Sequence, residues 1–220
     1  MSLSPPPYIP YAPISGAPVT YRWSDYDPYS VIPEVDDAVM DCLDRVSNRA
    51  NTAFTLGCAE WVIFRLNRID PDSEPTEALE AYWLWAMDAD PGISVLLDDQ
   101  GWAGPVRGPI HLALLCVSNS INMSEDGLAT NHAAIAAGVA LLVLPDPQSF
   151  LDWQGKALTR LEALYPRDLE SPDGHGVPRE ALDPAVDVTP DNEAALIRAY
   201  VESLDRRANR FLVLFDQGYE

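Results

Sequence analysis

The sequence predicts an all-α protein, a single-domain bundle of six or seven helices around a buried central helix at about residues 128–144. Apolar residues recur at a three-to-four spacing over most of the chain, and no segment shows the sustained alternation typical of strands. Capping residues and prolines separate the periodic stretches. With 220 residues, 47% of them hydrophobic, the chain is long enough to bury a core without a metal or a disulfide.

The first 33 residues differ in composition from the rest of the chain. They hold eight prolines interleaved with six aromatic residues. Because proline fixes φ and removes a hydrogen-bond donor, we expect an extended arm over 1–33. Such an arm could be a ligand for the aromatic groove of another protein. Exposing six aromatic side chains is unfavourable, however, so we expect the arm to pack on a single helical domain over 34–220.

The first helices follow the arm. A helical period over 34–69 predicts one long helix or two helices that break near Gly57. Ser73 is positioned to cap a second periodic stretch, over 74–88. Four further helices are expected, beginning at Pro109, Ser124, Asp146-Pro147 and Thr189-Pro190, the last one running through Phe215. Residues 133–144 are apolar on every side, which predicts that this helix is the central one.

The cellular compartment is predicted from three observations. The N-terminus has neither a basic start nor an apolar stretch of the signal-peptide kind. The longest apolar run, 133–144, is shorter than the about 20 residues that cross a bilayer. The three cysteines are odd in number and lie in apolar segments, which favours reduced thiols. We therefore expect a cytoplasmic protein.

The charge balance is the strongest compositional signal. Thirty-four acidic residues oppose fourteen basic ones, and the formal net charge is -20. Nucleic acids and anionic membranes are poor partners for such a surface, whereas a basic protein is a good one. The alternative is that the charge serves only to keep the protein soluble.

The acidic residues fall into three runs. No basic residue lies between Arg68 and Arg107, only Arg179 lies within 168–193, and a third run over 25–44 leads into the first helix. The first two runs overlap long expected loops, which are often functional. The residues predicted to bind a partner are Asp70, Asp72, Glu74, Glu77, Glu80, Asp88, Asp90, Asp98, Asp99, Trp102, Asp173 and His175. Trp83 and Trp85 are further candidate aromatic anchors.

The stretch GWAGPVRGPIHLALL, residues 101–115, has two possible interpretations. A glycine-rich loop before a helix is typical of an anion site, but Pro105 and Pro109 remove two of the N–H groups that such a site needs. We therefore interpret Gly108-Pro109 as a helix start and expect Arg107 to pair with Asp98 or Asp99.

A metal-dependent all-α hydrolase is an alternative function. Asp36, Asp37 and Asp41 share about one and a half helical turns and could hold Mg²⁺, and Glu77 and Glu80 form a second pair. Such chemistry needs a further carboxylate set on a facing helix, which the sequence does not show at a clear spacing. Carboxylates in a first turn also stabilise a helix without any metal.

Other catalytic signatures are missing. The three histidines lack metal-ligand spacing, Cys58 and Cys116 lie within apolar helices, and no phosphate-loop, dinucleotide, nucleophile-elbow or zinc motif is present. No catalytic residue, cofactor or resident metal is therefore predicted. We expect an acidic cytosolic binding protein that masks a basic surface of a partner protein, most concretely an immunity or antitoxin-type inhibitor of a toxic enzyme. A structural subunit of a larger assembly, joined through the arm, is the remaining alternative.

Overall fold

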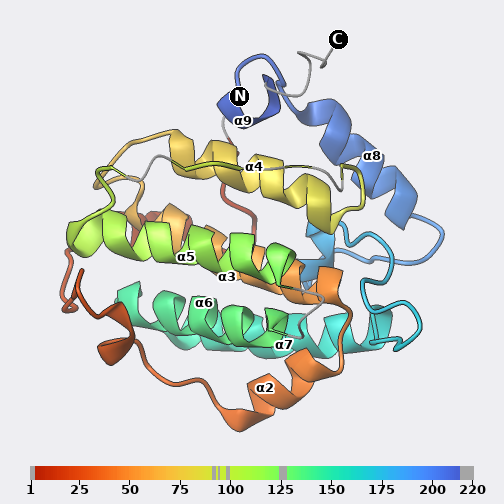
Figure 1. Ribbon diagram of the computed structural model, residues 1–220, viewed down its shortest axis with the longest axis horizontal. Coiled ribbons are helices and arrows are strands. Elements are labelled where there is room, and N and C mark those ends of the chain that lie inside the picture. Colours follow the sequence, from red (N-terminus) through yellow and green to blue (C-terminus); the bar gives the residue numbers. More distant parts are fainter. Residues whose placement is uncertain (1–2, 91–92, 94, 98–99, 124–127, 214–220) are drawn as a thin grey trace.

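The computed structural model describes residues 3–90, 93, 95–97, 100–123 and 128–213, and its elements are all helical (Figure 1). The longer helices are α2 (Asp37–Asp44), α3 (Asn48–Leu66), α4 (Glu74–Ala86), α5 (Gly104–Asn122), α6 (Ala129–Val143), α7 (Gln148–Leu164) and α8 (Glu193–Ser203). The shorter ones are α1 (Tyr11–Ser15), η1 (Pro28–Ser30), η2 (Arg179–Leu182) and α9 (Arg210–Val213). Across the described residues, β-type pairing is limited to one bridge between Val46 and Pro166, so the all-α prediction is confirmed.

Helix α3 lies at the centre of the molecule. All of its 19 residues are buried, and it packs against α4, α5, α6 and α7. Figure 1 shows α4 above α3 and α5, with α6 and α7 below them. Several polar side chains of α3 have hydrogen-bond partners inside the fold: the Asn51 amide donates to the carbonyl of Leu43, and the Thr55 hydroxyl donates to the carbonyl of Asn51.

The prediction that the helix over 128–144 is central is wrong. Helix α6 packs on α3 and α5, but it exposes Asn131 and only partly buries Ile135 and Leu141. Its alanines allow a close approach to α3 and α5, and Gly138 on another side lies against Ile32 and Pro33. Hydrophobicity alone predicted α6 and not α3 as the central helix, because α3 carries Glu, Arg, Asn and Thr side chains whose partners lie far away in the sequence.

The predicted helix over 34–69 is two helices, but the break is not at Gly57. It lies at residues 45–47, where the Ser47 hydroxyl accepts a hydrogen bond from the N–H of Ala50 and begins α3. Gly57 lies in the middle of α3. A Cβ at this position would approach Leu182 and Trp153 to 2.7 and 2.8 Å, so the packing requires a glycine here. This glycine permits close packing and does not interrupt the helix.

Helix α5 begins at Gly104, one turn before the predicted start at Gly108-Pro109. Pro109 therefore lies inside the helix and has no N–H for the carbonyl of Pro105. The hydroxyl of Tyr21 donates to that carbonyl instead, which explains how the proline is accommodated. A Cβ at Gly108 would overlap the indole of Trp23, so the N-terminal segment also requires a glycine there.

Other helix ends agree in part with the sequence. The carboxylate of Asp146 accepts from the N–H of Gln148 at the start of α7, as predicted. Ser73 precedes α4, but the carboxylate that caps the N–H of Glu74 belongs to Asp72. The expected final helix from Thr189-Pro190 is divided into α8 and α9. Ser124 and Phe215 lie outside the described residues.

The segment over 3–33 is not extended throughout, because it contains α1 and η1. The Tyr8 hydroxyl donates to Glu60 of α3 over 2.6 Å, and Ile9 and Ile14 are buried. The carbonyl of Pro18 accepts from Arg65, whose Nε donates to the carbonyl of Val143. Arg65 therefore lies at the C-terminal ends of α3 and α6, where the helix dipoles favour a cation.

Candidate functional site

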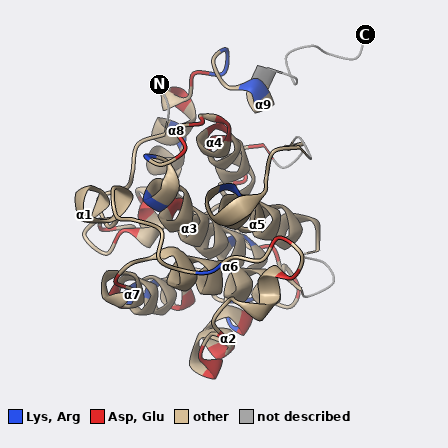
Figure 2. Ribbon diagram, turned by 90° about the vertical axis from the view of Figure 1, so that its left-hand side faces the viewer, with Lys and Arg blue, Asp and Glu red and all other residues tan. Residues whose placement is uncertain are grey.

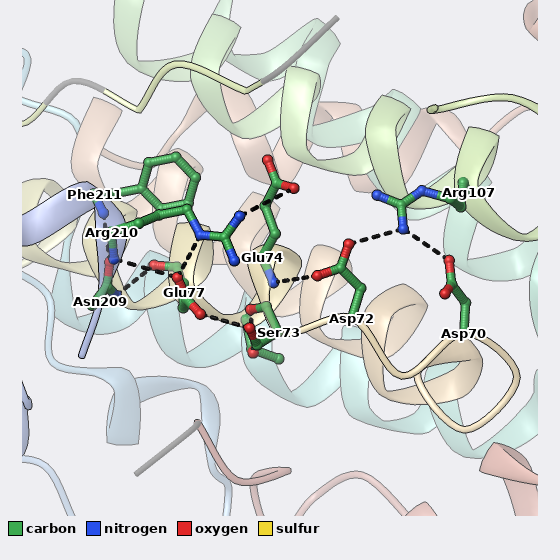
Figure 3. Close-up of polar contacts among 10 residues, drawn as sticks. Asp70, Asp72, Ser73, Glu74, Glu77, Arg107, Asn209, Arg210 and Phe211 are labelled. Carbon is green, nitrogen blue, oxygen red and sulfur yellow. Dashed lines mark hydrogen bonds and ion pairs between the residues drawn. The ribbon is translucent and has the colours of Figure 1, made fainter. Parts of the chain in front are cut away.

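The acidic residues at the start of α4 lie in a network of internal ion pairs (Figure 3). Arg107 of α5 donates from Nη1 to Asp70 and to Asp72, over 2.9 Å in each case. Burial alone would raise the pKa of Asp72, but hydrogen bonds from the N–H of Glu74 and from Arg107 outweigh it and lower that pKa. Arg107 thus fastens the end of the α3–α4 turn to α5.

Arg210 of α9 forms the corresponding ion pairs with the first turn of α4. Its Nε donates to Glu77 over 2.8 Å, and its Nη1 lies 3.5 Å from Glu74 (Figure 3). Burial of Glu77 would raise its pKa, yet the Ser73 hydroxyl and Arg210 lower it overall. Glu80 is buried and accepts from Asn209 over 2.9 Å, and desolvation raises its pKa. We call Asp70, Asp72, Glu74, Glu77 and Glu80 the paired cluster.

Other predicted partner-binding residues are also engaged within the chain. Asp88 accepts from Arg49 over 2.7 Å, although half of its side chain stays exposed. Trp102 is buried, with the guanidinium of Arg107 4.3 Å from its ring centroid and the His111 ring 5.2 Å away. Asp90 is partly exposed. Trp83 and Trp85 are buried as well, so none of these tryptophans is a surface anchor.

The sequence predicts that Arg107 pairs with Asp98 or Asp99; among the described residues, its ion pairs are with Asp70 and Asp72. Asp98 and Asp99 themselves lie outside the described residues.

Asp173 and His175 hold the start of α3 and the start of α8. Asp173 accepts from the side-chain amide of Asn48, and its carbonyl accepts from the N–H of Arg49. The Nε2 of His175 lies 3.4 Å from Glu193, and its ring lies 5.0 Å from that of Tyr165. The His175 side chain is 60% exposed to solvent, so it remains accessible to a partner.

A different acidic surface lies on α2, whose ribbon in Figure 2 is coloured red for Asp and Glu at several positions at the bottom of the molecule. Asp37, Asp41 and Asp44 are exposed, and they follow the i, i+4, i+7 spacing of one helix face. The opposite face of α2 buries Leu43 and packs against α6 and α7. Within the described part of the chain, these three carboxylates have no ion pair.

The turn that follows α7 continues this surface. The bridge between Val46 and Pro166, with a hydrogen bond from the N–H of Arg167 to the carbonyl of Arg45, places residues 166–170 beside the end of α2. Asp168 and Glu170 are exposed, and Leu169 between them keeps 88% of its surface in solvent. We call Asp37, Asp41, Asp44, Asp168, Leu169 and Glu170 the acidic edge.

Two arginines lie next to the acidic edge without neutralising it. Arg45 donates from Nε to Glu162 over 2.6 Å. This hydrogen bond is the main reason that the pKa of Arg45 is raised, and the nearby charge of Asp41 contributes less. Arg167 donates to the backbone carbonyl of Asp44. The sequence run over 25–44 already contained half of this surface. Its juxtaposition with 168–170 depends on a contact between residues 120 positions apart, which the sequence alone does not reveal.

The residues of the alternative metal site do not converge. Asp36 caps α2 by accepting from the N–H of Ala38, while Asp37 and Asp41 face solvent. Glu77 and Glu80 are held by Arg210 and Asn209. Among the residues that the structure describes, no group of three or more His, Cys, Asp or Glu side chains is arranged to hold a metal ion.

The candidate cysteine nucleophiles are buried thiols. Desolvation raises the pKa of Cys116 to about 12 and that of Cys58 well above its ordinary value. All three cysteines are free. A thiol that stays protonated at neutral pH is a poor nucleophile, so neither buried cysteine is activated for catalysis.

Comparison with known proteins adds no functional assignment. No protein-family model matches the chain, and neither a curated protein nor a solved structure matches it significantly. Over the described residues, none of the helices is both long enough and apolar enough to cross a membrane.

Proposed function

We propose that this chain is an acidic cytosolic binding protein whose acidic edge covers a basic surface of a partner protein. The supporting observation is the contrast between its carboxylates. Those of the paired cluster are largely occupied by Arg107, Arg210 and Asn209, whereas those of the acidic edge face solvent without an ion pair among the described residues. Like charges held together this way oppose folding, so their retention favours a role in recognition.

Leu169 gives the edge an apolar contact point. An 88% exposed leucine at the tip of a turn contributes little to the core and has acidic residues on both sides. Interfaces typically combine a desolvated apolar centre with a charged rim that sets orientation and association rate. The matching partner surface is a shallow apolar depression ringed by lysine or arginine.

The most concrete form of this proposal is an immunity or antitoxin-type inhibitor. The partner would be a toxic enzyme whose active site binds a nucleotide or a nucleic acid. Its basic groove would accept the carboxylates of the acidic edge where phosphates otherwise bind. A net charge of -20 would accelerate the encounter and make the affinity strongly dependent on salt.

The proposal is tested by affinity capture with the tagged chain as bait, in lysate of its source cells at low and at high ionic strength. We expect a basic protein to be retained at low salt and released at high salt. The Asp37→Lys/Asp41→Lys variant should no longer retain this basic protein at low salt. The matched control is Asp187→Lys/Glu202→Lys, which reverses two exposed charges that do not belong to the acidic edge.

A captured protein supports the proposal only when the purified pair reproduces the difference between the two variants. The inhibitor form further requires that the wild-type chain suppress an activity of the captured protein. The proposal fails if no protein distinguishes the two variants, or if capture is independent of salt.

A further inference from the structure

A groove separate from the acidic edge lies between the N-terminal segment, the first half of α7 and residues 180–185. It consists of two adjoining hollows of about 70 and 360 Å³ that share Pro7, Tyr8 and Asp183. The smaller hollow also contacts Arg179 and Glu180, and the larger one contacts Ser149, Asp152, Trp153, Lys156, Pro184 and Ala185. Its walls come from three distant parts of the chain.

The positive charge of Arg179 is already neutralised. Its Nε donates over 2.8 Å to Glu60, a fully buried carboxylate of α3, and its Nη2 donates to the carbonyl of Ser4. Glu60 also accepts from the Tyr8 hydroxyl and from the indole N–H of Trp83. Each charge of this pair therefore has its partner inside the protein, and the pair leaves no net charge in the groove.

The remaining groups make the groove anionic. Glu180, Asp152 and Asp183 supply three carboxylates against the single ammonium of Lys156. The Oε2 atom of Glu180 is buried and has no hydrogen-bond partner among the residues that the structure describes. Burying a carboxylate oxygen without a donor is unfavourable. Arg179 lines the same hollow but donates to Glu60 and to the carbonyl of Ser4, so a donor for this oxygen is missing.

The apolar part of the wall is aromatic. Tyr8 and Trp153 stack with their ring centroids 5.2 Å apart, and Phe54 covers Trp153 at 5.8 Å. Trp153 is itself buried, stacked against both Tyr8 and Phe54, and its indole N–H donates to the carbonyl of Leu182. The aromatic surface left to the groove is therefore mainly that of Tyr8, which is only partly buried. Aromatic surface beside carboxylates is the combination that recognises organic cations.

We propose that this groove binds an alkylammonium or guanidinium group, with the cation directed to Glu180 and Asp183 and the alkyl stem along Tyr8. The cation supplies the donor that Glu180 lacks, and its hydrogen bonds are strengthened by charge. The site does not depend on the partner proposed for the acidic edge, because the two surfaces share no residue. The cation is either an arginine side chain of another protein or a small free amine.

Isothermal titration calorimetry of the full chain tests this site with three compounds. N-acetylargininamide represents a side chain, agmatine represents a free cation, and N-acetylcitrullinamide is an uncharged control of nearly the same shape as the first. We expect a guanidinium compound to bind at least about ten-fold more tightly than the citrulline compound. Preference for N-acetylargininamide assigns the site to a protein side chain, and preference for agmatine assigns it to a free cation.

Variants connect the binding to the groove. Glu180→Gln keeps the shape and should weaken binding at least about five-fold, whereas the matched Glu202→Gln on α8 should change it less than two-fold. Lys156 is the single lysine of the chain and lines the groove, so N-acetylargininamide should also slow its acylation, measured by mass spectrometry. The proposal is overturned if neither cation binds at about 10 mM, or if the citrulline compound binds equally well.

Discussion

The paired cluster and the acidic edge have almost the same composition and opposite surroundings. In the paired cluster, Arg107 of α5 and Arg210 of α9 form ion pairs with the clustered carboxylates, and these pairs connect the start of α4 to both helices. At the acidic edge, the adjacent ion pair between Arg45 and Glu162 leaves Asp37, Asp41 and Asp44 exposed to solvent. An acidic run therefore predicts neither stability nor recognition until its distant partners are known.

The difference has an energetic consequence. Carboxylates that accept charge-assisted hydrogen bonds at partly buried sites stabilise the fold. Carboxylates that repel one another in solvent contribute little or oppose it, and their repulsion is relieved when a basic surface covers them. Substitutions that break an ion pair should therefore lower the free energy of unfolding more in the paired cluster than beside the acidic edge.

The largest expected effect is that of Arg107→Met. This change leaves Asp70 and Asp72 without their shared cation, while the methionine keeps part of the packing on Trp102. We expect the free energy of unfolding to fall by about 2 kcal/mol, because the arginine side chain is only 24% exposed. The matched Arg45→Met breaks a pair whose side chains are 52% and 38% exposed, and should cost less than about 1 kcal/mol in urea unfolding. Equal losses would show that the two regions do not differ.

A smaller effect, with a distinctive pH dependence, is expected for Glu77→Gln. Since the fold lowers the pKa of Glu77, its stabilisation is present above the ordinary carboxylate pKa and is lost as the pH falls through the folded value. The variant should be about 1 kcal/mol less stable than wild type at pH 7, and this difference should shrink as the pH falls below the ordinary carboxylate pKa.

Glu80→Gln, one turn away on α4, is the opposite control. Burial raises the pKa of Glu80, so its contribution is present at low pH and is lost as the pH rises through the folded value. This variant should therefore gain stability relative to wild type as the pH rises. A common pH profile for both variants would contradict the assignment of these environments.

The smallest effect is expected at the acidic edge itself. Asp44 is the last residue of α2, where a negative charge opposes the helix dipole, so Asp44→Asn should raise the free energy of unfolding by about 0.5 kcal/mol. Asp37 lies in the first turn, and Asp37→Asn should lower it by a similar amount, about 0.5 kcal/mol. A loss for Asp44→Asn would mean that this carboxylate has a stabilising partner.

Much of the helical architecture could be predicted from local signals. Apolar periodicity predicted the all-α class, and Asp146-Pro147 marked the start of α7. The central helix could not be found this way, because the buried Glu60 and Arg65 of α3 form hydrogen bonds with residues from distant parts of the chain. The start of α5 was missed for a similar reason, since Tyr21 replaces the N–H that Pro109 lacks.

The candidate site shows the same limit. The acidic runs were visible in the sequence, but Arg107 and Arg210 meet their carboxylates across 35 or more residues and up to 133. Trp102 seemed an exposed anchor because it lies in a loop, yet Arg107 and His111 cover it. Only the tertiary contacts distinguish neutralised acid from acid that is available to a partner.

The most direct test of the central claim is the affinity of the purified complex as a function of salt, for two triple variants. Asp37→Lys/Asp41→Lys/Asp168→Lys reverses the acidic edge, and Asp187→Lys/Asp191→Lys/Glu202→Lys reverses three exposed charges elsewhere. We expect the first to weaken binding by at least about 100-fold and to flatten its salt dependence, and the second to change the affinity less than about three-fold. Equal losses in the two variants, or a partner that binds the reversed edge unchanged, would contradict the claim that the acidic edge is the recognition surface.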